Sequence, residues 1–295
     1  MYKNVICFGE VLWDVFPAQK VAGGAPMNVA IRLESIGISA AVISRTGMDE
    51  PGEELLSIIK SKCVDTSLIQ HDKALPTGEV LVQADSNGIA TYDIIYPAAW
   101  DKIELNDRNT EAVKNADAFV FGSLACRDNI SKNTLLAMLD LAPYKIFDVN
   151  LRPPFYKPEL TEQLMNKSDF IKLNNEELLI IAGAMGSRTN NLEENTRFIA
   201  EKTSTSTICI TKGKDGATLF TKGFFYSHPG YTVTVEDTVG CGDSFLAALI
   251  SGLLNKTGYT EALAFACATG AIVATHKGAN PLIEPSDIEK LMRGK

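Results

Sequence analysis

The chain reads Asp-Thr-Val-Gly-Cys-Gly-Asp-Ser-Phe from Asp237 to Phe245, and an apolar helical pattern follows at once. Two glycines bracket a small residue there, so backbone N–H groups can turn toward one point. The new helix adds its positive N-terminal end, and together these features predict a site for a phosphate or an oxyanion. Asp243 falls in the first helical turn, where a carboxylate is either a charge that favours the helix or a general base.

The composition predicts a folded, acidic protein. A chain of 295 residues with 45% apolar content has enough material for a substantial core. The formal charge of −8 argues against nucleic acid and against anionic membranes as partners, because both require clustered Lys and Arg. A nucleotide would therefore need local positive potential from backbone dipoles, a few cations and metal ions.

The six cysteines lie far apart without Cys-x-x-Cys spacing, so we expect buried thiols in a reducing compartment. Glu10 and Asp14 interrupt the first apolar run, which therefore differs from a signal peptide. The longest apolar run, residues 262–275, is too short to span a bilayer. The sequence predicts a cytoplasmic protein, and the lack of repeats or a Pro/Ser-rich linker predicts a single domain over residues 1–295.

The order of apolar segments predicts an α/β protein. Strand patterns alternate with helical patterns along most of the chain. The expected strands are 4–8, 41–44, 118–121, 145–149, 169–173 and 206–211, and the expected helices are 29–36, 51–62, 131–141, 260–275 and 285–292. Polar residues follow several of the strands, and ligands bind beyond the carboxyl ends of strands in open parallel sheets. We therefore expect one shared crevice at these strand ends.

Residues 77–99 break this rhythm. Glu79–Gln83 and Ala90–Ile95 flank Asp85-Ser-Asn-Gly88, which is a strong hairpin signal. Together with residues 11–22, the hairpin is expected to form a small sheet that covers one end of the main domain. Such a lid would exclude water from a reaction centre, and the alternative is a plain edge hairpin.

Motifs along the whole chain resemble those of the ribokinase-like (PfkB) carbohydrate kinases. Residues 237–248 resemble the second signature of that family, Asn174-x-x-Glu177 is similar to its Asn-x-x-Glu motif, and Thr211-Lys-Gly213 is similar to its nucleotide-side strand end. The first signature matches at Gly23, Gly24, Asn28, Gly37 and Gly47. Within the family, residues 9–14, 24–28 and 148–152 look most like those of fructokinases.

The resemblance implies a ribokinase-like three-layer α/β/α domain with a mostly parallel central sheet and a small β-sheet lid. It also implies transfer of the γ-phosphate of ATP to a primary hydroxyl of a sugar, with D-fructose as the expected substrate. Ribose, 2-keto-3-deoxygluconate and a catalytically silent sugar-binding sensor stay open as alternatives. Asp243, Asn174 and Glu177 argue against the sensor, which would have no need of a base.

By this resemblance, the backbone N–H groups of Gly240, Cys241, Gly242 and Asp243 form an anion hole, and the Asp243 carboxylate takes the proton from the sugar hydroxyl. Cys241 departs from the alanine, glycine or serine that is usual in the family. Only its backbone N–H is expected to act, so activity should survive. The competing nucleotide motifs are absent, because the chain has no Walker A loop and Phe245 stands where a Rossmann motif would need glycine.

The resemblance assigns a second set of residues to the sugar. Carboxylate and amide groups match sugar hydroxyls, and glycines let the backbone approach the ring closely. The expected sugar-binding residues are Asp14, Gly23, Gly24, Asn28, Asn150 and Arg152. For Asp14 the alternative is a surface turn, and for Arg152 it is a surface ion pair.

A third set is assigned to the nucleotide and to metal. Asn174, Thr211, Lys212, Gly213 and Gly216 are expected to bind ATP, while Glu177 and Asn174 organise Mg²⁺ through waters. An N-cap with acidic first-turn residues is the alternative for Asn174 and Glu177, and both roles can hold together. Family members often respond to a monovalent cation such as K⁺ and often form a homodimer through the lid. The sequence leaves both properties open.

Overall fold

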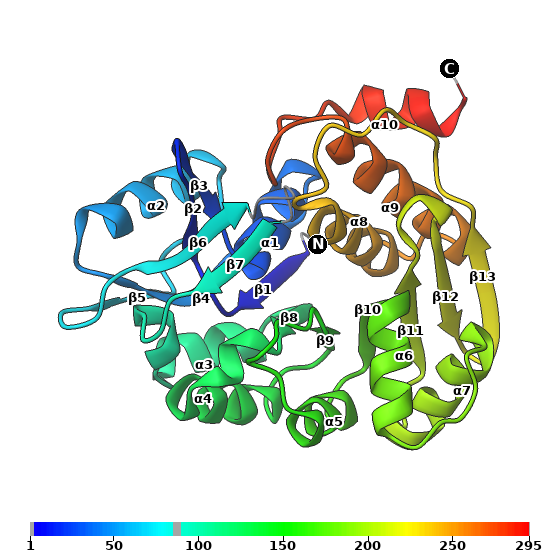
Figure 1. Cartoon of the computed structure of the whole chain (residues 1–295), viewed down its shortest axis with the longest axis horizontal. Coiled ribbons are helices and arrows are strands. Elements are labelled where there is room, and N and C mark those ends of the chain that lie inside the picture. The colour runs from blue at the N-terminus through cyan, green and yellow to red at the C-terminus, as the bar shows by residue number, and fades with distance from the viewer. Residues whose placement is uncertain (1–2, 85–89, 295) are drawn as a thin grey trace.

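The computed structural model describes residues 3–84 and 90–294, and a nine-stranded sheet forms its centre (Figure 1). In spatial order the strands are β13 (Phe224–His228), β12 (Ala217–Thr221), β11 (Thr207–Thr211), β10 (Phe170–Asn174), β9 (Lys145–Asp148), β8 (Ala118–Gly122), β1 (Asn4–Phe8), β4 (Ser39–Gly47) and β5 (Ile69–Asp72). All neighbours from β11 to β5 are parallel, and β12 and β13 are antiparallel additions. The predicted mostly parallel sheet is confirmed.

Helices cover both faces of this sheet. The first face carries α1 (Ala25–Ser35), α2 (Glu50–Ser61), α8 (Cys241–Leu254) and α9 (Tyr259–Ala274). The second carries α3 (Asp107–Lys114), α4 (Asn129–Leu139), α5 (Pro158–Asn166), α6 (Asn175–Ala184) and α7 (Leu192–Thr203), and α10 (Pro285–Met292) packs on α9. The expected three-layer α/β/α arrangement is therefore confirmed (Figure 1).

The central strands are apolar on both sides because each side faces a helical layer. In β1, Val5 and Cys7 pack into the core of the first layer, whereas Ile6 and Phe8 pack into the core of the second. This alternation explains why the sequence shows continuous apolar runs at these strands.

The second sheet has four strands in the order β3 (Gln19–Gly23), β2 (Leu12–Phe16), β6 (Gly78–Ala84) and β7 (Ala90–Ile94). β6 and β7 form the predicted antiparallel hairpin, and β2 pairs with β6 in parallel. The predicted turn at residues 85–88 lies outside the described residues. The small sheet expected from residues 11–22 and 77–99 is confirmed, and it stands beside α1 at one end of the molecule (Figure 1).

Arg127 fixes the small sheet to the main domain. Its buried guanidinium pairs with Asp101 at 2.7 Å and lies 3.9 Å from the centre of the Trp100 ring. It also donates to the carbonyl oxygens of Ile94 and Ile95, where the small sheet ends, at 3.1 and 2.7 Å. Trp100 is fully buried in the packing under the small sheet.

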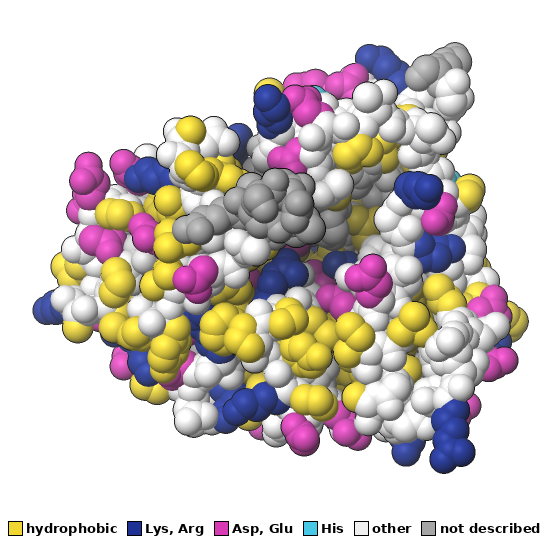
Figure 2. All heavy atoms as spheres, in the orientation of Figure 1, with side chains coloured by type: hydrophobic (Ala, Val, Ile, Leu, Met, Phe, Trp, Pro, Cys, Tyr) yellow, Lys and Arg dark blue, Asp and Glu magenta, His cyan; other side chains and the backbone are white. Residues whose placement is uncertain are grey.

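The chain order of the strands creates a crevice at the carboxyl end of β1. From β1 the chain passes first to β4 and β5 on one side and then to β8, β9, β10 and β11 on the other. Ligands bind at such a switch point in open α/β sheets. Figure 2 shows a hollow at the centre of one face, in which basic and acidic side chains meet.

The start of α1 and the exposure of Cys63 differ from the sequence prediction. Helix α1 begins at Ala25 and not at residue 29. Pro26 can stand in its first turn, because the N–H groups of that turn have no partner within the helix and proline lacks an N–H. Cys63 is exposed, whereas we expected buried thiols, since it follows the end of α2 in a left-handed turn at φ 64°. The other cysteines are buried or half-buried.

The helices in the described part of the chain include none with the length and apolar character needed to cross a membrane.

Candidate active site

Helix α8 begins in a turn that only glycine can make. Gly240 is its N-cap, with a left-handed φ of 74°, and a Cβ there would lie 2.5 Å from Ala279 Cα. Within the described part of the chain, the backbone N–H groups of Gly242 and Asp243 make no hydrogen bond. These N–H groups point out of the positive end of the helix and are available to an anion.

Asp243 and Asn28 meet across two helix N-termini. Asn28 lies in the first turn of α1, Asp243 lies in the first turn of α8, and the two helices pack against each other. Asn28 Nδ2 donates to Asp243 Oδ2 at 2.8 Å. The structure thus joins the expected sugar motif directly to the expected catalytic carboxylate.

Burial raises the pKa of Asp243 to about 6, and the negative charge of Asp148 adds to the rise. The hydrogen bond from Asn28 and the charges of Lys172 and Arg152 act in the opposite direction. At neutral pH the side chain is therefore a carboxylate, and it is more basic than an exposed aspartate. Both properties suit a general base.

Lys172 is a residue of this site that the motifs did not identify. Its Nζ lies 3.0 and 3.2 Å from the two carboxylate oxygens of Asp148, and both side chains are buried. The same Nζ lies 3.4 Å from the point where a Cβ on Gly242 would stand. Burial alone would lower the pKa of Lys172, yet the negative charges of Asp148 and Glu177 raise it, so the ammonium stays charged beside the start of α8. The available signal was a lysine inside the apolar strand β10.

Asp14 in β2, Gly23 at the end of β3 and the following Gly24 form the side of the site that the small sheet contributes. Burial raises the pKa of Asp14 to about 6, with a further contribution from the charge of Asp243. A Cβ on Gly23 would overlap the Asp14 carboxylate, and a Cβ on Gly24 would overlap the carbonyl oxygen of Glu10. The glycine pair therefore leaves room for Asp14 and for close approach of the backbone.

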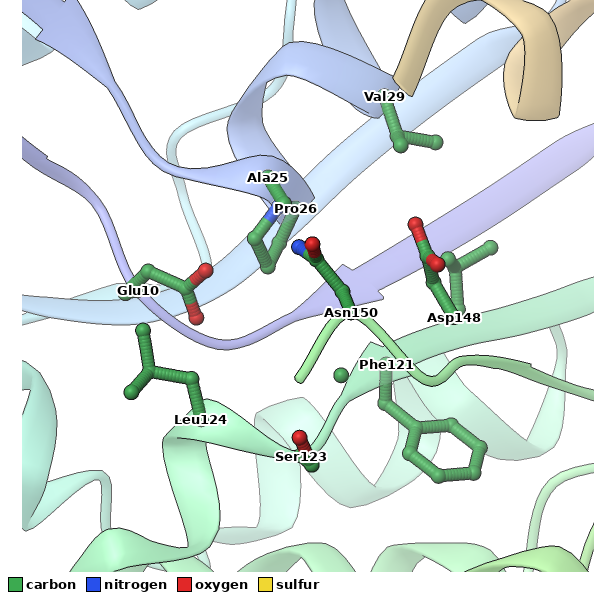
Figure 3. A pocket seen from close by; sticks show the side chains of 11 residues that line it. Glu10, Ala25, Pro26, Val29, Phe121, Ser123, Leu124, Asp148 and Asn150 are labelled. Carbon is green, nitrogen blue, oxygen red and sulfur yellow. The ribbon is translucent and has the colours of Figure 1, made fainter. Parts of the chain in front are cut away.

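A cavity of about 10 Å³ opens where β1, β8 and β9 end, which is room for about one water. Figure 3 shows the Glu10 and Asp148 carboxylates on either side of the Asn150 amide. Asn150 has a left-handed φ of 41°, a conformation that asparagine adopts more readily than most residues. Burial raises the pKa of Glu10 to about 7. Glu10 was not predicted as a site residue, although it follows β1 at the crevice.

Arg152 lies at the mouth of the site. Its side chain is exposed, and its one hydrogen bond in the described part of the chain goes to the carbonyl oxygen of Leu151, at 3.3 Å. Its positive charge lowers the pKa values of Glu10, Asp14 and Asp243. No ion pair within the described residues neutralises it, which leaves the guanidinium free for a ligand oxygen.

Asn174 and Glu177 form a capping box at the start of α6. Asn174 Oδ1 accepts from the Glu177 N–H, and Glu177 Oε2 accepts from the Asn174 N–H, both at 2.8 Å. Glu177 Oε1 also accepts from Leu151 N–H at 2.8 Å, so the buried carboxylate ties β10 to the loop after β9. The N-cap alternative is therefore present in the structure.

The remaining predicted residues lie further along the same sheet edge. Thr211 ends β11, and Lys212 N–H donates to the Gly216 carbonyl oxygen at 2.8 Å across a short turn that contains Gly213. A Cβ on Gly216 would overlap the carbonyl oxygen of His228. In the described structure, none of these four residues bonds to Asp243 or to its immediate partners. They belong to a separate part of the crevice.

The match to known families covers nearly the whole sequence, because residues 2–286 match the pfkB family of carbohydrate kinases. The chain belongs to this family. It is an ATP-dependent carbohydrate kinase, a phosphotransferase with an alcohol group as acceptor. The predicted family and activity class are confirmed.

Relatives of this kinase carry several names. A probable fructokinase-2 from Arabidopsis thaliana is 30% identical, over 97% of this chain and 94% of that protein. The crystal structure of a fructokinase with bound ATP from Xylella fastidiosa superposes with a TM-score of 0.88 at 21% identity, covering 100% of this chain and 99% of the other. An aminoimidazole riboside kinase from Salmonella enterica gives a TM-score of 0.83 at 24% identity, covering 98% and 100%. The two structures show that the kinase shares their fold.

Proposed function

We propose that this kinase transfers the γ-phosphate of ATP to a primary hydroxyl of D-fructose, within a single domain whose small sheet acts as a lid. The observation that carries the proposal is the contact of Asn28 with Asp243 at 2.8 Å, next to the free N–H groups that begin α8. The amide proposed to bind the sugar and the buried carboxylate proposed as the base thus lie at one helix terminus with free N–H groups. Such an arrangement serves phosphoryl transfer through positioning and charge stabilisation.

In the proposed reaction, the oxygen of the sugar hydroxyl attacks the γ-phosphorus in line, and Asp243 accepts the proton of that hydroxyl. The bond to the bridging oxygen of ATP breaks, and ADP leaves. The backbone N–H groups of Gly240, Cys241, Gly242 and Asp243 are proposed to stabilise the charge on the transferring group. Of these, the Cys241 N–H donates to the Thr238 carbonyl oxygen at 3.3 Å and would have to turn from it. Lys172 adds a buried positive charge on the same side of α8. Asp14, Gly23, Gly24, Asn28, Asn150 and Arg152 are proposed to hold the sugar.

Asn174 and Glu177 fit a hydrated Mg²⁺. Glu177 uses one acceptor site on each carboxylate oxygen for a backbone N–H, which leaves capacity for metal-bound water. Across residues 3–84 and 90–294, no cluster of three or more His, Cys, Asp or Glu is placed to hold a metal directly. Mg²⁺ usually keeps several waters and binds substrate phosphates, whose charge it neutralises. Thr211, Lys212, Gly213 and Gly216 are proposed to bind the nucleotide with Asn174.

D-Fructose is proposed because the relatives at 28–30% identity are named fructokinases. A panel of fructose, ribose and 2-keto-3-deoxygluconate in a coupled ADP-release assay tests this choice. The proposal requires the highest kcat/KM for fructose. Turnover of ribose or of the keto-acid without turnover of fructose would overturn the proposal that fructose is the substrate, but it would be consistent with sugar kinase activity.

The role of Asp243 is tested with Asp243→Asn, which keeps the shape and removes the base. Turnover should fall by about two or more orders of magnitude, given the usual contribution of a general base. Sugar binding measured by calorimetry should stay nearly unchanged, because Asp243 mainly acts on the reacting hydroxyl. Asp287→Asn, at an exposed ion pair on α10, is the control. Near-normal turnover of Asp243→Asn would remove the base from the mechanism.

Three further properties are proposed from the family resemblance. The small sheet is proposed to form a homodimer contact, which light scattering tests. A monovalent cation such as K⁺ is proposed to raise activity, which assays in K⁺ and Na⁺ salts test. A cytoplasmic location is proposed from the free cysteines, which fit a reducing compartment.

A further inference from the structure

The carboxamide of Asn28 is held at both of its ends. Its Nδ2 donates to Asp243 Oδ2 at 2.8 Å, and its Oδ1 accepts from Asn280 Nδ2 at 2.7 Å. Asn280 lies in the loop between α9 and α10, which is remote in sequence from both partners. Three segments of the chain therefore meet in one directed series of hydrogen bonds that ends at the catalytic carboxylate.

Arg32 makes a parallel connection one helical turn further along α1. Its Nε donates to Ser244 Oγ at 3.1 Å, and an Nη donates to the carbonyl oxygen of Pro281 at 3.2 Å. Asn28 and Arg32, at positions i and i+4, lie on one face of the helix. They contact consecutive residues of α8 and consecutive residues of the loop. Ala279 in the same loop packs against Gly240, so the loop is anchored on both sides of Asn280.

We propose that Asn280 is a positioning residue of the kinase: it fixes the Asn28 carboxamide so that the NH₂ group, and not the carbonyl, faces Asp243. The proposal rests on the proposed role of Asp243 as the base. Nothing in the family resemblance assigns a function to Asn280.

The direction of the series follows from what each group can donate. An asparagine side chain offers an acceptor on one side and two donors on the other, and the two orientations have nearly the same shape. If Asn28 were flipped, its carbonyl oxygen would face the Asp243 carboxylate, and two acceptors would repel. Asn280 opposes a flip of Asn28 alone, because the NH₂ groups of the two amides would then face each other and two donors would meet.

In the described part of the chain, the Asn280 side chain makes one hydrogen bond, which is the one to Asn28. Its Oδ1 is buried and has no hydrogen-bond partner in the described part of the chain. An unpaired buried acceptor carries a cost, so the amide is not placed there for the sake of its own hydrogen bonds. The donor that it presents to Asn28 accounts for its orientation.

The consequence for Asp243 depends on the other charges around it. The acidic groups around it are Asp148 at the end of β9 and Glu10, Asp14 and Cys241 on neighbouring segments, whereas Lys172 and Arg152 are basic. Burial and Asp148 raise the pKa of Asp243, and the donation from Asn28 is a main opposing effect. Loss of that donation should therefore raise the pKa further, and the base would be protonated at a higher pH.

The experiment compares Asn280→Leu with wild type by NMR titration of the Asp243 carboxyl carbon, without substrates. Leu has a similar volume and no donor, so the Asp243 pKa should rise by on the order of one unit. The acid limb of kcat/KM should move with it, which lowers kcat/KM at pH 6 about threefold to tenfold and leaves it nearly unchanged at pH 8.5. Asn255→Leu, at the far end of α8, is the matched control and should leave the titration unchanged.

Two further variants separate positioning from a general loosening of the loop. Asn280→Gln keeps a hydrogen-bond donor on a longer side chain, so the Asp243 pKa should lie between those of wild type and Asn280→Leu. This variant still tests the proposal if Asn280→Leu folds poorly. In an Asn28→Ala background, Asn280→Leu should add no shift, because the series is already broken. An unchanged Asp243 titration in Asn280→Leu, or additive shifts in the double variant, would overturn the proposal. An active Asp243→Asn enzyme would instead overturn the proposed base, since the NMR titration needs no turnover.

Discussion

Lys172 and Asp148 form a buried ion pair whose ammonium lies 3.4 Å from the point where a Cβ on Gly242 would stand. The pair spans β10 and β9, and both strands end at the crevice. A protein with a formal charge of −8 thus carries a desolvated positive charge beside the helix start that is proposed to bind phosphate. Such a charge is worth more there than at the surface, because the surroundings screen it poorly.

Replacement of Lys172 by Met should reduce both turnover and stability. The transferring phosphoryl group would lose a preorganised cation, so kcat should fall by roughly two orders of magnitude. The buried Asp148 would lose its partner, which costs about 3–5 kcal/mol of unfolding free energy. Steady-state kinetics and urea denaturation measure the two effects.

The control for this change is Lys167→Met, which breaks an exposed pair with Asp140. An exposed pair contributes about 1 kcal/mol or less, so stability and turnover should stay close to wild type. A Lys172→Met enzyme that lost stability but kept its kcat would show that the pair is structural and takes no part in catalysis.

Glu10 should make the stability of the protein depend on pH. Its pKa, about 7, lies above the ordinary value for an unfolded chain, so the folded state binds more protons than the unfolded state between about pH 4 and pH 7. The stability that protonated Glu10 contributes is present at low pH and is lost as the pH rises through this window. Glu10→Gln should therefore raise the unfolding free energy at pH 8 by roughly 2 kcal/mol and change it little at pH 4.

Urea denaturation at pH 4, 6 and 8 checks this expectation. Glu176→Gln, at an exposed carboxylate in the first turn of α6, is the control and should show no such trend. Equal effects of Glu10→Gln at pH 4 and pH 8 would contradict the raised pKa, because they would mean that the charge of Glu10 is not what matters.

The sequence was sufficient for the sheet but not for every element around it. Central strands such as β1 are apolar on both faces, so their continuous runs stand out. β5 was not predicted, because it is a short edge strand with Gln70 and His71 at its middle. Helices α3 and α7 were not predicted either, since few of their positions face the core and most are polar.

The residues of the site also fall into those that the sequence predicted and those that it did not. Asp243 and Asn28 were predicted because each lies in a local motif with glycine at fixed spacing. Lys172, Glu10 and Asn280 were not, since their environment comes from segments far away in the sequence. The partner of Lys172 is 24 residues away, and that of Asn280 is 252 residues away. A single lysine or asparagine carries no local signal of such a partner.

Cys241 should be dispensable as a side chain. Burial raises the pKa of its thiol to about 11, with further contributions from Asp237 and Asp243, so it stays protonated at neutral pH. Cys241→Ala keeps the backbone N–H and should retain kcat within about threefold, since a loss of 0.7 kcal/mol or less is expected. With iodoacetamide at pH 8, the exposed Cys63 should react before Cys241, which peptide mass spectrometry resolves. A strong loss of activity in Cys241→Ala would give the thiol a role of its own.

Gly240 and Gly242 should respond differently to the same substitution by alanine. At Gly240 the left-handed φ of 74° and the contact with Ala279 both exclude a Cβ, so Gly240→Ala should lower the unfolding free energy by about 2 kcal/mol or more. At Gly242 the nearest neighbour is the Lys172 ammonium at 3.4 Å, and the backbone is helical. Gly242→Ala should therefore fold normally.

Its defect should appear in catalysis. The added methyl group would stand 3.4 Å from the ammonium of Lys172 at the start of α8, where we place the transferring phosphoryl group. We expect kcat to fall at least tenfold with the KM for the sugar little changed, because the sugar motif lies on α1. Gly252→Ala, further along α8, would instead crowd Ala262 and report packing alone. Normal turnover in Gly242→Ala would place the reacting phosphorus away from this helix terminus and would leave the charge of Lys172 without a catalytic partner.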